Sequence, residues 1–171
     1  MKIILPEFSL VFLLGVSGAG KSTFARQHFA PTEMISSDQI RAMICDDENN
    51  QRANKETFEV LHLLAAKRLA HHKLTVIDAT NVEVAARQPL LALAQEYQAP
   101  ALAIVLNLKE VICLARDAER TARTVGKTII HQQSYNLRMS LGGLRREGFS
   151  KVYNLFTPEE IATVEIEIEK A

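Results

Sequence analysis

The 171-residue sequence has few cysteines, no excess charge of either sign and no long hydrophobic run. Its two cysteines, Cys45 and Cys113, lie far apart and outside any CxxC pair, so they indicate neither a disulfide framework nor a zinc site. The apolar run 9–14 is too short to cross a bilayer, and glycines follow it in place of a cleavage site. We therefore expect a cytoplasmic protein without membrane contact.

The charge is balanced in number but not in position. Lys and Arg together number 20, as do Asp and Glu, which disfavours a protein that coats long nucleic acids. Segment 31–60 has seven acidic and three basic residues, whereas segment 106–151 has nine basic and four acidic ones. Any nucleic-acid contact would therefore be a local patch, although solvated helix faces are the better explanation for most of these charges. Zero net charge favours self-association, which makes a homodimer a further expectation.

Apolar segments bounded by turns alternate with helical patterns along the chain. Several of these segments are apolar on both faces, as strands of a covered parallel sheet are. The predicted strands are 9–14, 33–36, 74–78, 101–106 and 151–155. The predicted helices are 20–29, 54–72, 83–98, 109–121 and 127–147. The alternation predicts one α/β domain over 1–171 with a parallel sheet, and the tail 159–170 fits either an edge strand or a helix.

The strongest motif is GxxxxGK[ST], which runs from Gly15 to Ser22 between a predicted strand and a predicted helix. Its glycines let backbone N–H groups surround phosphate oxygens, and the helix N-terminus adds partial positive charge. Lys21 can reach the β- and γ-phosphates, and the Ser22 hydroxyl can bind Mg²⁺. We expect ATP, or another nucleoside triphosphate, to bind here with Mg²⁺. The expected contacts are Gly15, Ser17, Gly18, Ala19, Gly20, Lys21, Ser22 and Thr23.

Other classes of protein with this loop carry markers that are missing here. A GTPase would show the base-recognition motif Asn-Lys-x-Asp, whereas residues 54–57 are Asn-Lys-Glu-Thr and lack the aspartate at the fourth position. An ABC-type ATPase would need a longer chain. A small phosphoryl-transfer enzyme remains, although a nucleotide-binding module without catalytic activity would carry the same loop.

A phosphoryl-transfer enzyme needs a group that orients and deprotonates the acceptor hydroxyl. Asp38 directly follows the strand 33–36, at the carboxyl edge of the sheet, where ligands bind in open α/β folds. Arg41 shares its face if a helix starts at Ser37. An ionised aspartate beside an arginine can accept a proton, but Ser37 or Asp38 could equally cap the helix. The spacing leaves both roles open.

Two further groups of polar residues follow predicted elements. Asp78 ends the strand 74–78, where it could act on Mg²⁺ through water, hold an arginine or begin a turn. Arg116, Arg120 and Arg123 recur at i, i+4 and i+7, so one helical face could carry all three guanidiniums over a transferring phosphoryl group. A solvated helix face would show the same spacing. The expected fold is thus a P-loop kinase with an arginine-bearing lid.

Five segments together resemble one known family. They are the phosphate-binding loop 15–22, 35–38, 46–51, 74–81 and 144–149. In order and spacing, over nearly the whole chain, they are similar to the 5′-hydroxyl polynucleotide kinase module of bacterial RNA-repair proteins, which also carry phosphatase and ligase modules. The acidic Asp-Asp-Glu-Asn stretch and the Asp-Ala-Thr-Asn strand end are the more specific parts. The chain would be either an excised module, with the phosphatase and ligase modules of the same polypeptide as partners, or a free-standing kinase.

The resemblance implies ATP as donor and a 5′-OH end of RNA or DNA as acceptor, in the healing of broken ends. It implies Asp38 as general base, Arg41 beside the acceptor, and Arg116 and Arg123 as catalytic arginines on the donor phosphates. Arg120 matches the pattern as a nucleotide contact, whereas Thr124-Val125-Gly126 departs from the more polar stretch of the family.

Further acceptor contacts are hypotheses about loops that could face the cleft. They are Gln51, Thr80 and Arg87. The alternative function is a P-loop kinase that phosphorylates a hydroxyl of a small metabolite.

Overall fold

The centre of the computed structural model, which describes residues 1–121 and 124–170, is a five-stranded parallel sheet. Its order is β3-β4-β2-β5-β6. The strands are β3 (Met34–Ser36), β4 (Thr75–Asp78), β2 (Leu10–Leu14), β5 (Ala101–Leu106) and β6 (Lys151–Leu155). All five predicted strands are therefore confirmed. The order places β2 centrally, where Phe12 lies opposite Ile77 of β4 and Ala103 of β5.

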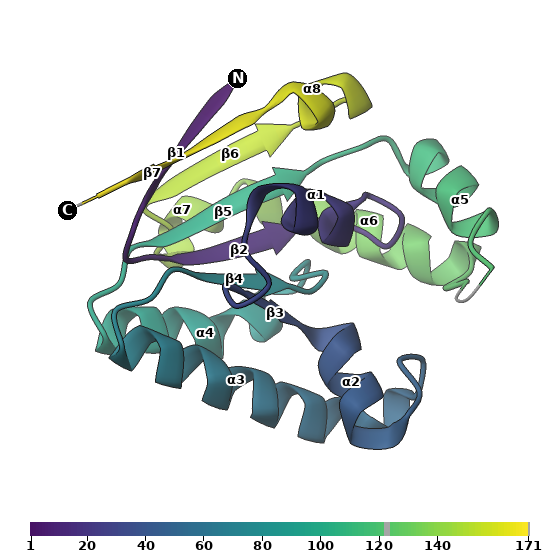
Figure 1. Cartoon of the computed structure of the whole chain (residues 1–171). Coiled ribbons are helices and arrows are strands. Elements are labelled where there is room, and N and C mark those ends of the chain that lie inside the picture. The colour runs from purple at the N-terminus through teal and green to yellow at the C-terminus, as the bar shows by residue number, and fades with distance from the viewer. Residues whose placement is uncertain (122–123, 171) are drawn as a thin grey trace.

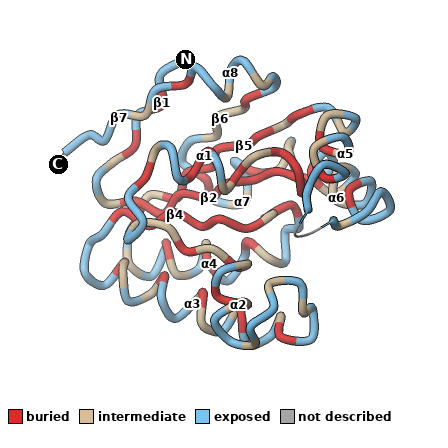
Figure 2. The backbone as a smooth tube through the Cα atoms, turned by 45° about the vertical axis from the view of Figure 1, so that its right-hand side comes forward, coloured by how far each residue is buried: buried red, intermediate tan, exposed pale blue. Residues whose placement is uncertain are grey.

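The core follows the two central strands. Every residue of β2 and β5 is buried, as the red tube in Figure 2 shows. Both faces of these strands are apolar because the crossovers of a parallel sheet place helices against each face. The T-shaped contact between Phe12 and Phe149 continues this core toward the chain that enters β6.

Helices connect the parallel strands and extend beyond the carboxyl ends of the sheet. They are α1 (Lys21–His28), α2 (Ser37–Cys45), the 3₁₀ helix η1 (Gln51–Ala53), α3 (Asn54–Ala70), α4 (Val84–Glu96), α5 (Glu110–Ala118), α6 (Lys127–Leu141) and α7 (Leu144–Glu147). Figure 1 shows α3 and α4 side by side, while α2, α5 and part of α6 flank the end to which the strand arrows point. That end carries the phosphate-binding loop.

Two predicted helices differ from the structure by more than their terminal residues. The pattern at 127–147 is interrupted at Gly142-Gly143, so it forms α6 and α7. The predicted helix 109–121 ends at Ala118, where the Asp117 carboxylate accepts hydrogen bonds from the backbone N–H groups of Val125 and Gly126 at 3.0–3.1 Å. These bonds turn the chain back toward α6. Arg120 therefore lies outside α5 and Arg123 lies outside the described residues, so the prediction of one helical face with three arginines was wrong.

A second, two-stranded sheet joins the two ends of the chain. β1 (Lys2–Pro6) pairs in parallel with β7 (Glu165–Glu169), and Ile3 lies opposite Ile166. The tail forms both expected elements in turn, because α8 (Pro158–Thr163) precedes β7. β1 was not predicted, since its partner lies at the opposite end of the sequence. Of the helices in the described part of the chain, none combines the length and the hydrophobicity that crossing a membrane requires.

Candidate active site

The loop between β2 and α1 has the backbone that phosphate binding needs. Gly18 and Gly20 have φ angles of +84° and +96°, in the left-handed region that favours glycine. A Cβ at Gly18 would lie 2.4 Å from the carbonyl oxygen of Cys113 in α5, so the loop packs directly against this helix. Gly20 precedes α1, whose first N–H groups have no intrahelical acceptor. The loop therefore presents a concave backbone surface at a helix N-terminus.

The Lys21 side chain folds back over this loop. Its ammonium group donates hydrogen bonds to the carbonyl oxygens of Gly15 at 2.8 Å and Val16 at 3.0 Å. Burial lowers the pKa of Lys21 to about 8, although the nearby carboxylates of Asp78 and Asp38 oppose the shift. A bound phosphate would supply the negative charge that favours the protonated lysine.

Ser22 and Asp78 form the part of the site that fits a magnesium ion. Burial raises the pKa of Asp78, while a hydrogen bond from the Ser22 hydroxyl and the charge of Lys21 act in the opposite direction. A hydroxyl and a carboxylate are the hard oxygen donors that Mg²⁺ uses together with phosphate oxygens and waters. Among the described residues no cluster of three or more His, Cys, Asp or Glu side chains could hold a metal alone, so nucleotide phosphates would have to complete the coordination.

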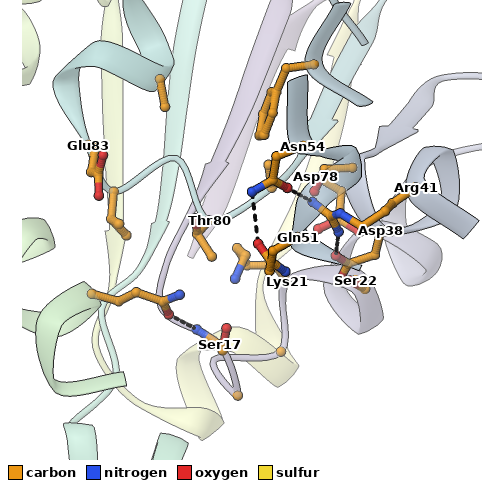
Figure 3. Close-up of a pocket in the computed structure, with 18 of the residues that line it drawn as sticks. Ser17, Lys21, Ser22, Asp38, Arg41, Gln51, Asn54, Asp78, Thr80 and Glu83 are labelled. Carbon is orange, nitrogen blue, oxygen red and sulfur yellow. Dashed lines mark hydrogen bonds and ion pairs between the residues drawn. The ribbon is translucent and has the colours of Figure 1, made fainter. Parts of the chain in front are cut away.

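Asp38 and Arg41 face each other on the first turns of α2. Arg41 donates to Asp38 at 2.8 Å, and the i, i+3 spacing places both side chains on one face of the helix. Neither Ser37 nor Asp38 is the N-cap of α2. The N-cap is Ser36, whose hydroxyl accepts a hydrogen bond from the backbone N–H of Gln39. Figure 3 shows Asp38, Arg41 and Ser22 close together.

These residues line a pocket of about 360 Å³ at the carboxyl edge of the sheet. Of the predicted site residues, eleven line it: Ser17, Gly18, Gly20, Lys21, Ser22, Asp38, Arg41, Gln51, Asp78, Thr80 and Arg120. The lining does not include Gly15, Ala19, Thr23, Arg87 or Arg116. Arg116 nevertheless reaches the loop, since it donates to the Ala19 carbonyl oxygen at 3.4 Å. Thr23 is exposed on α1.

Several pocket residues were not predicted from the sequence. The Gln133 side chain of α6 accepts a hydrogen bond from the Ser17 backbone N–H at 2.8 Å, drawn as a dashed line at Ser17 in Figure 3. Asn54 and Phe58 of α3 also line the pocket. Asn54 lies beside Arg41, and Glu83 lies on the opposite side in Figure 3. No local motif marks these residues, because segments far apart in the sequence bring them to the pocket.

Arg87 occupies a different environment from the one predicted. Its side chain is fully buried, where it donates to both Glu147 oxygens at 2.7–2.8 Å and to the Asn81 carbonyl oxygen at 2.7 Å. An acceptor could not reach this guanidinium without opening the fold. The structure therefore gives Arg87 a structural role, as the link between α4 and α7, in place of the predicted acceptor contact.

Replacing Arg87 with alanine is expected to lower the free energy of unfolding by about 3–5 kcal/mol, because the fully buried guanidinium is lost and the Glu147 carboxylate, only 14% exposed, would lose its partner. The KM for the phosphate acceptor should stay unchanged. Denaturant unfolding and steady-state kinetics measure the two effects, with exposed Arg138→Ala as a control. A raised acceptor KM in a variant of unchanged stability would restore the acceptor-binding hypothesis.

The arrangement of the sheet, the helices and the pocket is that of a P-loop kinase: a parallel sheet is flanked by helices, and a nucleotide-binding loop lies at its carboxyl edge. A family model described as AAA domain matches residues 10–138, about three quarters of the sequence. The chain therefore belongs to this AAA domain family.

Solved structures with this fold have several different functions. A chain of the Pnkp1/Rnl/Hen1 RNA repair complex is 25% identical with a TM-score of 0.66, and the match covers 80% of this chain but only 46% of that one. A gluconokinase from Sinorhizobium meliloti 1021 is 16% identical with a TM-score of 0.57, covering 92% and 87%. Kti12 from Chaetomium thermophilum, in complex with ADP-AlF3, is 16% identical with a TM-score of 0.62, covering 90% and 93%. No curated protein sequence matches.

Proposed function

We propose that the protein transfers the γ-phosphate of ATP to the 5′-OH end of RNA or DNA. The observation that carries the proposal is the Asp38–Arg41 pair in the same pocket as Lys21 and Ser22. It places a carboxylate beside a fixed cation at the phosphate-binding loop. The similarity to a chain of an RNA repair complex supports a nucleic-acid end as the acceptor.

In this reaction the loop amides and Lys21 hold the donor phosphates. Arg120, which lines the pocket, and Arg116, which contacts the loop at Ala19, add positive charge. Asp38 accepts the proton of the 5′-hydroxyl as the oxygen attacks the γ-phosphorus, and ADP leaves. Arg41 donates a hydrogen bond to an oxygen of the acceptor. Ser22, and Asp78 through water, would hold Mg²⁺, which would neutralise charge on the phosphates. Arg123, which lies outside the described residues, stays a proposed contact of the donor phosphates.

The decisive test is transfer of labelled γ-phosphate from ATP to a short 5′-OH oligonucleotide. We expect label at the 5′ end with Mg²⁺ present and none after its removal by a chelator. Confirmed ATP binding without label on either RNA or DNA would overturn the proposal. Gln51 and Thr80, which line the pocket, stay predicted acceptor contacts, and their alanine variants should raise the acceptor KM.

A second candidate is phosphorylation of a small-metabolite hydroxyl. It is favoured by the gluconokinase match, which covers most of both chains. Ionic strength separates the candidates, because each acceptor phosphate contacted contributes a slope of about −0.7 in log K against log salt for a single strand. A metabolite without phosphates would give almost no slope.

The proposed function also bears on the partners, the location and the oligomeric state of the protein. The match covers less than half of the RNA-repair chain, which is consistent with phosphatase and ligase modules joined to this domain in one polypeptide. A cytoplasmic location and a homodimer stay predictions. Light scattering checks the dimer.

A further inference from the structure

The guanidinium of Arg41 is held from three directions inside the pocket wall. Its Nη1 donates to Asp38 Oδ1 at 2.8 Å and to the Glu48 carbonyl oxygen at 3.0 Å. Its Nη2 donates to Asn54 Oδ1 at 2.7 Å, the shortest of the three bonds. The side chain of Arg41 is only 5% exposed, whereas that of Asp38 is 43% exposed. The arginine is thus the fixed member of the pair.

Asn54 is itself fixed by a neighbour. It is the first residue of α3, and its Nδ2 donates to Gln51 Oε1 of η1 at 2.9 Å. In Figure 3 the dashed lines run from Gln51 through Asn54 to Arg41. The amide has one donor and one acceptor group, and both are used in this chain of bonds. Gln51 therefore sets which way the Asn54 amide points.

The orientation of Arg41 depends on few bonds. Its Nε is buried, and no acceptor in the described part of the chain lies within hydrogen-bond distance of it. The two Nη1 bonds, to Asp38 Oδ1 and to the Glu48 carbonyl oxygen, hold the guanidinium at only one of its three nitrogens. The Nη2 bond to Asn54 fixes the plane of the group, and it leaves the second Nη2 hydrogen for a ligand.

We propose that Asn54 is a positioning residue for phosphoryl transfer: it locks Arg41 so that the arginine orients both the Asp38 carboxylate and the acceptor end. The proposal rests on the proposed function. It also gives Gln51 a second role as the support of Asn54. Asn54 has no contact with the phosphate-binding loop among the bonds described, so its effect should reach the acceptor and not the nucleotide.

The test is a double-mutant cycle on transfer to a 5′-OH oligonucleotide. Asn54→Ala should lower kcat/KM for the oligonucleotide about 10- to 30-fold, with the KM for ATP and the melting temperature nearly unchanged. Asn54→Asp should recover much of the loss, because a carboxylate still accepts from Nη2. In an Arg41→Ala background, Asn54→Ala should change kcat/KM less than about twofold. Asn49→Ala, an exposed asparagine of the same segment, is the matched control.

Oligonucleotide binding by fluorescence anisotropy completes the cycle if Arg41→Ala is too slow to assay. Additive losses in the double variant, an equal loss of ATP affinity, or no loss in Asn54→Ala would overturn the proposal while leaving the proposed function intact. A wild-type protein that does not label the oligonucleotide would overturn the proposed function, and this proposal with it.

Discussion

Replacing Asp38 with asparagine should lower kcat for phosphoryl transfer about 10²- to 10⁴-fold, the range that a general base contributes. The amide oxygen can still accept from Arg41 Nη1, so the pocket wall should keep its shape. The amide cannot take a proton from the acceptor hydroxyl. ATP binding should be retained, because the loop and Lys21 hold the phosphates. Single-turnover transfer and calorimetric ATP titration measure the two quantities.

Asp46→Asn provides the control for Asp38→Asn. Asp46 is an exposed acidic residue at the end of α2, and its φ of 55° is one that asparagine tolerates well. Its substitution should leave kcat unchanged. If Asp38→Asn kept full activity, the base assignment would be wrong. If the wild-type protein and the Asp38→Asn variant both bound ATP and neither transferred phosphate, a nucleotide-binding module without catalytic activity would be the better description.

Replacing Gly18 with alanine should weaken ATP binding at least about 100-fold, which corresponds to about 2.7 kcal/mol. The added Cβ would lie 2.4 Å from the Cys113 carbonyl oxygen and 3.1 Å from the Cys113 Cα, and both neighbours are backbone atoms that cannot rotate away. The φ of +84° adds strain for any side chain. Either the loop or α5 must move, and in both cases the phosphate-binding amides lose their arrangement.

Gly142→Ala is the matched control for this substitution. No heavy atom lies within 4 Å of its added Cβ, and its φ is −68°. ATP titration and thermal unfolding of both variants should therefore separate the loop effect from a general glycine effect. Normal ATP affinity in Gly18→Ala would mean that the nucleotide does not use this loop conformation.

The sequence alone predicted the features that local patterns encode. The strands of the five-stranded sheet are short segments with apolar residues bounded by turns, and the loop motif lies between a strand and a helix, so both could be placed by residue number. Asp38 and Arg41 could be paired because a helix start at Ser37 fixes their spacing on one face. The two candidate caps, Ser37 and Asp38, lie one and two residues after the observed cap Ser36, because serine and aspartate at all three positions are good capping residues in a sequence.

The features that were missed depend on contacts between distant segments. Gln133 lies 116 residues from Ser17, and Glu147 lies 60 residues from Arg87. Because it is paired with Glu147, the Arg87 side chain is buried and does not line the pocket. The end of α5 was also set from a distance, because Asp117 binds backbone groups eight and nine residues later. Periodicity cannot reveal such partners.

The pairing of β1 with β7 has a mechanical consequence. The two strands are parallel, so the start of β1 and the end of β7 lie at opposite ends of the ladder. Tension applied to the two chain ends would slide the strands past each other and would load the backbone bonds of the ladder together, along with the ion pair between Lys2 and Glu167. A domain tethered at both ends would thus resist stretching in shear. The phosphate-binding loop follows β2 of the other sheet, so the β1–β7 ladder would bear the load before the loop does.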